Sequence, residues 1–496
     1  MMNRRSFLLS GLMSGVAAGV AQANAPLVSL RPLARAGGPI SATANGGLSG
    51  VLARAGLSGK VVCAVADVST GALLEEEGGA STLPPASVAK ALTALYALDT
   101  LGANHRFSTE LVATGPVSGG VLQGDLVLSG GGDSMLTTDH LAQMARSLKE
   151  AGIREVRGDF RIWDGALPMI KTIDPGQPDH VGYSPAISGI ALNFNRVHFE
   201  WKRGGSGWNV LMDARTERYR PTVSMARMQV AQRSVPVYTY ADKGGADHWT
   251  VARGALGNGG ARWLPVRKPA AYAADVFLTM ARSQGIVLKA AKQATHAPRG
   301  QVVAVHQSPP LSVMLKAMLR FSNNLMAEMI GLSATRARGV AAKTLAQSGD
   351  VMSRWAADKY GMKRSKLVDH SGLGSKSKMA PTDLVAALIA AHRAGQLKPL
   401  LKDFPLRDAN RRVIKDHRIK VTAKTGTLNF VSGLGGFMTA ADGTELAFAI
   451  FTADEDARAA LSRAERERPQ GARTWNRKAK DLQQKLIERW DAVYGA

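Results

Sequence analysis

The chain changes its pattern twice along its 496 residues, and this change limits its fold more than any other feature of the sequence. Residues 86–103 show the apolar spacing of a buried helix, and the same spacing returns after about residue 300. Between about 105 and 295, strand-like alternation and glycine turns dominate, with one clear helix at about 138–152. The sequence therefore predicts an α/β domain that is built from both ends of the chain and split by a β-rich insertion.

Shorter segments support this division. A hairpin is predicted at 61–76 around the turn Ser69-Thr70-Gly71, and another at 430–452 around Ala441-Asp442-Gly443. The strands predicted in the middle segment are 107–114, 121–128, 155–163, 197–201 and 208–212. The helices predicted after it are 310–320, 322–337, 341–361, 381–395 and 474–492.

The first residues resemble an export signal. Arg4 and Arg5 precede an apolar stretch from Phe7 to about Val20, and small residues follow as in an A-x-A cleavage site. We expect a signal peptide at 1–23, with a motif at 3–8 that resembles a twin-arginine signal; the ordinary secretory route stays open. No later segment is apolar for long enough to span a bilayer, so we expect a periplasmic protein without a transmembrane segment after cleavage.

The charge is strongly basic, with 63 Lys and Arg against 39 Asp and Glu and a formal net charge of +24. This balance favours anionic surroundings such as nucleic acid, anionic lipid or an acidic polymer, and export argues against nucleic acid. The basic stretch 463–480 is interpreted as a solvated face, with contact to an anionic cell-envelope polymer as the alternative.

Three short motifs contain the candidate chemistry. In Ser87-Val88-Ala89-Lys90, positions i and i+3 lie on one helix face, which places the lysine amine within reach of the serine hydroxyl. Serine needs a base to become a nucleophile, and lysine can be that base only if its pKa falls. Burial, a helix N-terminus and a second cation would each lower that pKa. The sequence Ser375-Lys376-Ser377-Lys378 also matches S-x-x-K, but in a polar loop with no helix start.

The second motif is Ser322-Asn323-Asn324, at a predicted helix start. It is interpreted either as an N-cap or as a proton relay at Ser322 with Asn324 holding a substrate amide. The third motif is Lys424-Thr425-Gly426-Thr427, which follows a predicted strand. There Gly426 permits close approach of a peptide, the hydroxyls can bind a carboxylate, and Lys424 can supply the second cation beside Lys90.

Other candidates are weaker. The single cysteine, Cys63, lies in an apolar run and is expected in the core. It excludes an intramolecular disulfide and a cysteine-based zinc site. The ten histidines show no metal-ligand spacing, so neither a metal nor a cofactor is expected. His370 beside Asp369 is a minor catalytic candidate, and Gly130-Gly131-Gly132-Asp133 is interpreted as a plain turn.

In this order the three motifs are typical of β-lactamases and penicillin-binding proteins. The chain resembles the class C low-molecular-mass penicillin-binding proteins of the penicillin-binding protein 4 type, a family of D-alanyl-D-alanine carboxypeptidases and endopeptidases. That family has two extra domains between its first two motifs, which are 235 residues apart here. His370 departs from the family, which more often has glycine there. Further resembling stretches are 124–133, 191–195, 322–328, 369–373 and 423–434.

The resemblance implies a role for each motif residue. Ser87 would be the acylated nucleophile, Lys90 its general base and Ser322 a proton shuttle. Asn324 would orient the lysine and the substrate backbone. Lys424, Thr425 and Thr427 would recognise the terminal carboxylate beside Gly426, and the backbone N–H groups of Ser87 and Thr427 would form the oxyanion hole.

It also implies a penicillin-binding protein/β-lactamase-like transpeptidase domain of the α/β class, split by two smaller domains. The expected boundaries are 24–104 for the first catalytic part, 105–195 and 261–300 for one inserted domain, 196–260 for a domain nested in it, and 301–496 for the second catalytic part.

The expected partners are peptidoglycan stem peptides and β-lactam antibiotics. The expected reaction is hydrolysis of D-Ala-D-Ala, or of D-Ala-diaminopimelate cross-links, through a Ser87 acyl-enzyme. A serine β-lactamase and a non-catalytic envelope-binding relic remain as alternatives. The sequence leaves open the carboxypeptidase or endopeptidase preference, the role of the inserted domains, the oligomeric state and the deacylation rate.

Overall fold

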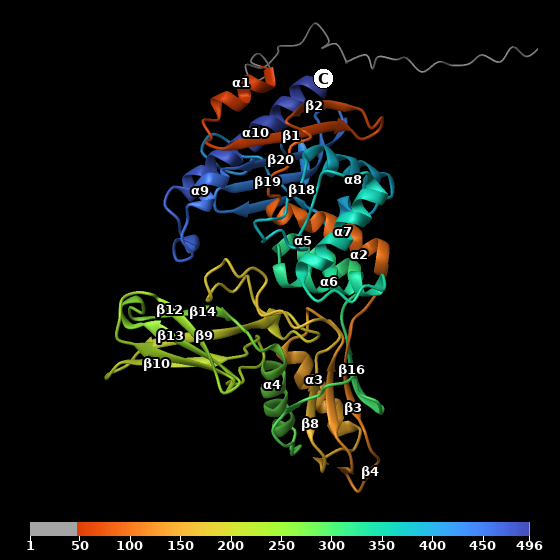
Figure 1. The fold of residues 1–496 in the computed structure, drawn as a ribbon, viewed down its shortest axis with the longest axis vertical. Helices are drawn as coiled ribbons and strands as arrows, with labels where there is room; N and C mark the ends of the chain where they lie inside the picture. The colour runs from red at the N-terminus through yellow and green to blue at the C-terminus, as the bar shows by residue number, and fades with distance from the viewer. Residues whose placement is uncertain (1–46, 496) are drawn as a thin grey trace, which may run out of the picture. The chain divides into compact units, whose positions relative to one another are not determined.

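The computed structural model describes residues 47–495 (Figure 1). The predicted signal peptide at 1–23 and its arginine motif lie outside these residues. Within the described part of the chain, no helix is both long enough and apolar enough to cross a membrane.

A six-stranded antiparallel sheet contains strands from both ends of the chain, in the order β17-β18-β19-β20-β1-β2. Both predicted hairpins are confirmed, and the first strand of the N-terminal hairpin pairs with the last strand of the C-terminal one, Val65 opposite Phe448. The strands are β1 (Lys60–Asp67), β2 (Leu73–Glu77), β17 (Lys402–Asp403), β18 (Lys420–Leu428), β19 (Val431–Thr439) and β20 (Glu445–Ala453).

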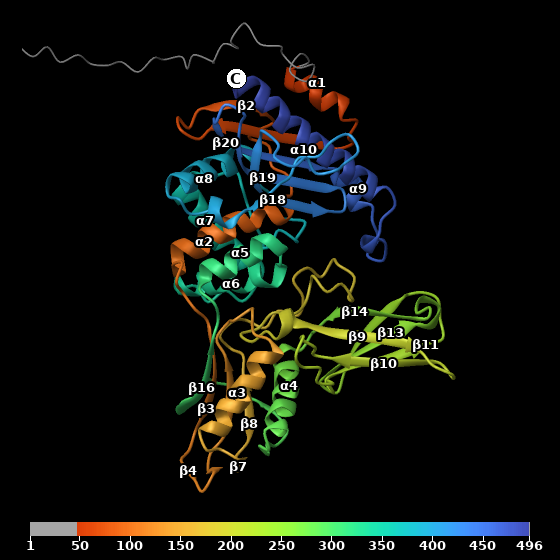
Figure 2. The same cartoon turned by 180° about the vertical axis from the view of Figure 1, so that it is seen from behind.

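Helices cover both faces of this sheet (Figures 1 and 2). Successive side chains of a strand point to opposite faces. Accordingly Val62 and Ala64 of β1 pack in the core that contains α2 (Ala89–Leu101) and α8 (Pro381–Arg393), whereas Cys63 and Val65 pack in the core that contains α10 (Ala472–Tyr494). Cys63 is a buried free thiol, as predicted.

The helical layer on the α2 side also contains α5 (Leu311–Phe321), α6 (Asn324–Ala337) and α7 (Leu345–Tyr360). These helices, α8 and α10 confirm the sequence predictions to within a few residues. Two short helices, α1 (Gly47–Arg54) and α9 (Glu455–Ala459), complete this part of the chain.

The middle of the chain builds its own sheets. A five-stranded sheet has the order β15-β8-β6-β3-β16, and it shares one hydrophobic core with α3 (Thr138–Glu150) and α4 (Pro269–Ser283). Its strands are β3 (Ser108–Ala113), β6 (Leu126–Gly130), β8 (Phe160–Trp163), β15 (Lys292–Gln293) and β16 (Gln301–Gln307). A small sheet contains β4 (Val117–Ser118), β5 (Val121–Leu122) and β7 (Glu155–Val156).

Two further three-stranded sheets have the orders β10-β9-β14 and β11-β13-β12. Their strands lie beside α4 in Figure 1. Their strands are β9 (Arg196–Arg203), β10 (Trp208–Asp213), β11 (Ala226–Ala231), β12 (Tyr238–Lys243), β13 (Ala246–Ala252) and β14 (Gly259–Pro265).

The sequence prediction is wrong in two details of this middle segment. Helix α4 was not predicted, although its buried residues Pro269, Tyr272, Val276 and Met280 follow helical spacing. It was missed because the whole segment around it was interpreted as β-rich. The predicted strands 121–128 and 155–163 are each two short strands. Both break at a glycine because the two backbones cross there: a Cβ on Gly158 would lie 2.4 Å from the carbonyl oxygen of Gly124.

Candidate active site

Ser87 lies in a tight turn that leads directly into α2. Pro84 and Pro85 precede a 3₁₀ turn at Ala86–Val88, and Ala86 has a φ of 46°, a left-handed conformation that is strained for alanine. Two glycines pack against this turn. A Cβ on Gly372 would lie 1.9 Å from the Ala86 carbonyl oxygen, and one on Gly426 would lie 3.0 Å from the Ser87 nitrogen. The strained turn is therefore held between strand β18 and the 369–374 loop.

Lys90 is fully buried one helical turn after Ser87. Its Nζ is 2.8 Å from Ser87 Oγ, 2.7 Å from Asn324 Oδ1 and 2.8 Å from the Ser371 carbonyl oxygen. The structure thus brings the first motif, the second motif and the 369–374 loop to one amine. Burial lowers the pKa of Lys90 to about 7, because an ammonium group is poorly solvated there.

Two buried carboxylates oppose this fall in the pKa of Lys90, and neither was predicted from the sequence. The charges of Glu328 and Asp369 favour the protonated amine. Glu328 accepts from the backbone nitrogens of His370 and Ser371, each at 2.9 Å. Asp369 accepts from the nitrogens of Gly372 and Gly374, at 3.1 and 2.6 Å. Both side chains therefore fix the loop that presents the Ser371 carbonyl to Lys90.

His370 has a packing role. It is completely buried, its Nε2 is 2.7 Å from Ser348 Oγ, and its ring is stacked on Tyr96. It also requires a glycine opposite, because a Cβ on Gly331 would lie 2.1 Å from the ring. Burial lowers the pKa of His370 to about 3, so the imidazole stays neutral at physiological pH.

The second motif divides between two functions. Asn323 is the N-cap of α6, where its side chain accepts from the Met326 nitrogen. Ser322 ends α5 in a left-handed conformation, with a φ of 54°, and its Oγ accepts from Lys424 Nζ at 3.0 Å. Asn324 contacts Lys90 through Oδ1 and donates from Nδ2 to the Tyr183 carbonyl at 3.0 Å. The cap and the candidate relay are therefore neighbouring but different residues.

Lys424 lies in the middle of β18 and is 1% exposed, so its ammonium group is buried rather than solvated. Its pKa is lowered well below the usual value, first by burial and then by repulsion from Lys90 and Lys402. The predicted coupling between the two lysines is therefore seen at Lys424, whereas burial is the main cause at Lys90.

The threonines of the third motif lie on the outer edge of the sheet. Strand β17 pairs with β18 only at Ala423 and Thr422, so within the described residues Thr425–Leu428 has no strand on its outer side. Thr427 is exposed and Thr425 half-buried. Such an edge can accept an extended peptide through backbone hydrogen bonds.

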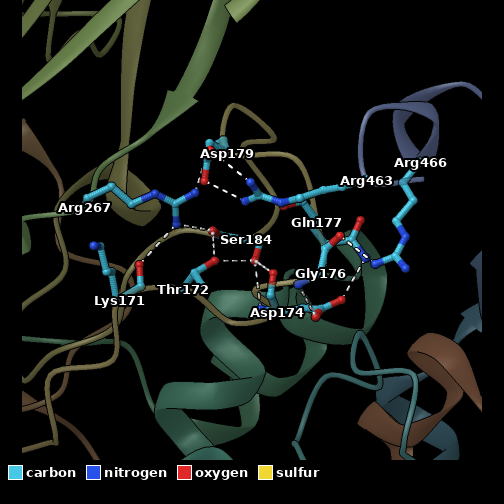
Figure 3. A network of polar contacts seen from close by, with 10 residues as sticks. All are labelled: Lys171, Thr172, Asp174, Gly176, Gln177, Asp179, Ser184, Arg267, Arg463 and Arg466. Atoms are coloured by element: carbon cyan, nitrogen blue, oxygen red, sulfur yellow. Dashed lines mark hydrogen bonds and ion pairs between the residues drawn. The ribbon is translucent and has the colours of Figure 1, made fainter. Parts of the chain in front are cut away.

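A polar network holds the segment that contains Tyr183 (Figure 3). Arg267 donates to the carbonyls of Ser184 and Asp179, each at 2.7 Å. Arg463 pairs with the Asp179 carboxylate at 2.8 Å, and Arg466 donates to the Gly176 carbonyl at 2.7 Å. Within the stretch 463–480, Arg463 is exposed, as predicted, and Arg466 is half-buried. Both arginines connect the C-terminal part of the chain to the insertion.

Comparisons with known proteins agree with this geometry. Residues 44–469 match the model of the D-Ala-D-Ala carboxypeptidase 3 (S13) family. The D-alanyl-D-alanine carboxypeptidase of Actinomadura sp. strain R39 is 30% identical over 423 residues, covering 78% of this chain and 76% of the relative. D-alanyl-D-alanine carboxypeptidase DacB of Haemophilus influenzae is 25% identical over 412 residues, covering 78% of this chain and 83% of the relative.

Solved structures show the same fold. The crystal structure of penicillin-binding protein 4 (dacB) from H. influenzae aligns with a TM-score of 0.67 and 20% identity, over 88% of this chain and 98% of that one. A second structure of that protein, complexed with a novel β-lactam, aligns with the same TM-score and 21% identity. The α/β class and its split arrangement are thereby shown.

Replacing Glu328 with glutamine should destabilise the protein in a pH-dependent way. Burial raises the pKa of Glu328 from 4.5 to about 8, so the folded state binds a proton there that the unfolded state releases. Stability from this group is therefore complete below pH 4.5 and is lost as the pH rises through about 8. We expect Glu328→Gln to lower the free energy of unfolding by about 1–3 kcal/mol at acidic pH, with a smaller loss at alkaline pH, measured by urea denaturation.

The matched control is Glu150→Gln, at the exposed end of α3. It should leave stability unchanged across the same pH range. A Glu328→Gln loss that grows with pH would contradict the raised pKa.

Proposed function

The chain belongs to the D-Ala-D-Ala carboxypeptidase 3 (S13) family, and we propose that it hydrolyses the D-Ala-D-Ala bond of peptidoglycan stem peptides through a Ser87 acyl-enzyme. One observation carries the proposal: the buried Lys90 amine lies 2.8 Å from Ser87 Oγ and is held on its other sides by Asn324 and Ser371. The site is therefore arranged to take the proton of a serine hydroxyl.

The contacts of Lys90 define the direction of that proton transfer. A neutral amine has two hydrogens and one lone pair. The oxygens of Asn324 and Ser371 can only accept, so they take the two hydrogens, and the lone pair is left for the Ser87 hydroxyl. The Nδ2 bond to Tyr183 fixes which end of the Asn324 amide faces the lysine. Ser87 then attacks the carbonyl carbon while its proton passes to Lys90.

Ser322 and Lys424 complete the cycle. When the C–N bond breaks, the proton that Lys90 took passes to the leaving amine through the Ser322 hydroxyl, which Lys424 Nζ holds in place, and Lys90 becomes neutral again. In the second step Lys90 takes a proton from the attacking water and returns it to Ser87 Oγ as the acyl ester breaks. D-Alanine leaves in the first step, and the shortened stem peptide leaves in the second.

Substrate binding should change the protonation of Lys424. The terminal carboxylate is expected at Lys424, Thr425 and Thr427, where it would stabilise a protonated Lys424. Gly426 permits the close approach of β18 to Ser87, whose backbone N–H would form the oxyanion hole together with that of Thr427.

The proposal includes the domain organisation. Residues 24–104 and 301–496 would form the catalytic part, 105–195 and 261–300 one inserted domain, and 196–260 a domain nested in it. The strand pairings support the division, since the six-stranded sheet contains no strand from 105–300. Strand β16 pairs with β3, so the inserted domain would extend to Gln307.

The proposed location is the periplasm, reached through the signal at 1–23. Peptidoglycan lies outside the cytoplasmic membrane, so an enzyme with this substrate must be exported. The proposed inhibitors are β-lactams, which would acylate Ser87 in place of a stem peptide.

Ser87→Ala should abolish covalent labelling by a fluorescent penicillin, because the attacking oxygen is removed. The native protein should keep its label on a denaturing gel and should remove one alanine from pentapeptide muropeptides, as seen by mass spectrometry. Ser375→Ala is the control, because Ser375 opens the other S-x-x-K match and lies in an exposed loop; it should label normally. Full labelling of Ser87→Ala would refute the assignment of Ser87 as the nucleophile. Rapid loss of label from the native protein would indicate a β-lactamase.

The rate of acylation should rise with pH up to about 7 and then level off. The lowered pKa of Lys90, about 7, means that the fraction of neutral base increases about tenfold per pH unit below that value. Stopped-flow acylation with a chromogenic β-lactam measures the profile. A rate that is flat or falls between pH 5 and 7 would exclude a lysine base with this pKa.

Gly426→Ala should slow acylation by roughly 10- to 100-fold, since displacing a reacting group by about 1 Å has this order of effect. The new Cβ would meet the Pro85 carbonyl oxygen at 2.7 Å and the Ser87 nitrogen at 3.0 Å. Gly205→Ala, with open space around its Cβ, is the matched control and should label at the native rate. Equal acylation rates for the two variants would show that the close approach of β18 at Gly426 does not position the Ser87 turn.

A further inference from the structure

A pocket of about 530 Å³ adjoins the second motif, and residues 322–324 form part of its lining. This volume is within the range of small-molecule binding sites. Further lining comes from the segment around Tyr183 and from Arg196, after which we name it the Arg196 pocket. The remaining side chains of the lining are apolar, among them Phe194, Ala317, Phe321, Leu325 and Met326.

Arg196 brings an unpaired positive charge to this apolar lining. Among the described residues of the lining, it alone is charged. Its side chain forms no hydrogen bond and no ion pair within residues 47–495, and its Nε is buried without a partner. Burial lowers the pKa of Arg196, but arginine stays protonated at physiological pH. A bound anion would therefore recover free energy that the protein itself does not supply.

Two aromatic rings hold the guanidinium in place. Its Cζ is 5.5 Å from the centre of the Phe194 ring and 5.8 Å from the centre of the Trp263 ring. Such rings attract a cation, but they do not accept the in-plane hydrogen bonds of a guanidinium as a carboxylate does. The rings therefore orient Arg196 and leave its N–H groups available to a ligand.

The backbone that carries Phe194 and Arg196 is strained. Residues 193, 194 and 195 have φ angles of 50°, 58° and 49°, and such left-handed conformations persist only where the surroundings enforce them. Buried Asn195 does so, because its Oδ1 accepts from the Leu192 nitrogen at 3.1 Å and its Nδ2 donates to the Ala186 carbonyl at 2.9 Å. The proposed reaction uses no side chain of this turn, so its strain has another purpose.

Phe321 adds an exposed aromatic surface to the pocket. It is the last residue of α5, and its side chain is 73% exposed. A large apolar side chain that is exposed beside other apolar surface marks a binding site. The lining thus combines apolar surface on several sides with one fixed cation.

We propose that the Arg196 pocket binds a small amphipathic carboxylate, with the carboxylate on Arg196 and an aryl or alkyl group against the apolar lining. A guanidinium matches a carboxylate because two parallel N–H bonds can form. The carboxylate can belong to a free ligand or to a substituent of the acylating substrate. The binding makes and breaks no covalent bond and does not need Ser87, so the inference goes beyond the proposed function.

The first test compares three probes by titration calorimetry with the full chain. 4-Phenylbutyrate has both the aryl group and the carboxylate, 4-phenylbutan-1-ol has only the first, and acetate has only the second. We expect 4-phenylbutyrate to bind roughly tenfold or more tightly than either of the others. Equal affinities for the acid and the alcohol would overturn the proposal.

The second test removes the cation. Arg196→Met keeps an unbranched apolar side chain, so the affinity for 4-phenylbutyrate should fall roughly tenfold or more while that for the alcohol stays unchanged. Arg203→Met is the matched control, because Arg203 ends the same strand and its Cζ is 5.2 Å from the centre of the Trp208 ring, outside the pocket. It should bind like the native protein. Native affinity in Arg196→Met, or equal losses in both variants, would contradict the assignment.

A third variant covers the case in which Arg196→Met does not fold. Phe321→Ala changes an exposed side chain, and it should weaken both phenyl probes by a similar factor because each loses an apolar contact. Native affinity for both probes in this variant would place the ligand elsewhere.

The last arm separates the pocket from the reaction and identifies the source of the carboxylate. Ser87→Ala should bind 4-phenylbutyrate like the native protein, and a loss of affinity there would overturn a separate pocket. The native protein is then acylated with benzylpenicillin and titrated again. Unchanged affinity would support a free ligand beside the active site, whereas lost affinity would support a pocket that receives part of the acylating substrate.

Discussion

The buried amine of Lys90 determines how the rest of the site is arranged. A lysine without contact to water needs partners for its polar hydrogens, because an unpaired polar group in the interior costs several kcal/mol. Its three oxygen partners belong to the turn before α2, to the start of α6 and to the 369–374 loop. These segments lie far apart in the chain, so satisfying one amine requires that they pack together. The same burial makes the amine a base near neutral pH, so structural and catalytic requirements coincide in one group.

The motifs predicted which side chains meet, because each contains a residue type with a defined chemical use at a fixed spacing. The roles of Glu328 and Asp369 could not be predicted in the same way, because they act through backbone nitrogens of a loop whose shape no motif describes. One signal was available: Glu328 is an acidic residue inside the apolar run 325–332, where a carboxylate must have buried partners. The Tyr183 carbonyl gave no signal, since any residue can supply one.

The C-terminal basic segment shows why net charge alone says little about function. Arg463 and Arg466 bond to other parts of the protein and hold the 174–184 segment that reaches Asn324. Arg473 and Arg477, a few residues later, have no such partner and face a groove. Two adjacent groups of like charge therefore have different surroundings, and only the positions of their hydrogen-bond partners distinguish them. Composition predicted an anionic partner but could not locate it.

The long separation of the first two motifs is tolerated because the insertion begins and ends at one place. Closing a flexible loop of about 200 residues would cost about 4–5 kcal/mol in chain entropy. Strands β3 and β16 reduce this problem, since they pair antiparallel with Ser108 opposite Gln307. The pairing continues toward α2 and α5, where Phe107 and Ser308 bond to each other and Leu311 donates to the His105 carbonyl. Once one residue pair between β3 and β16 has formed, the next pair along the two strands is already close in space. The insertion therefore ends beside the point at which it begins, next to α2 and α5. Its length does not prevent the contact between Ser322 and Lys424.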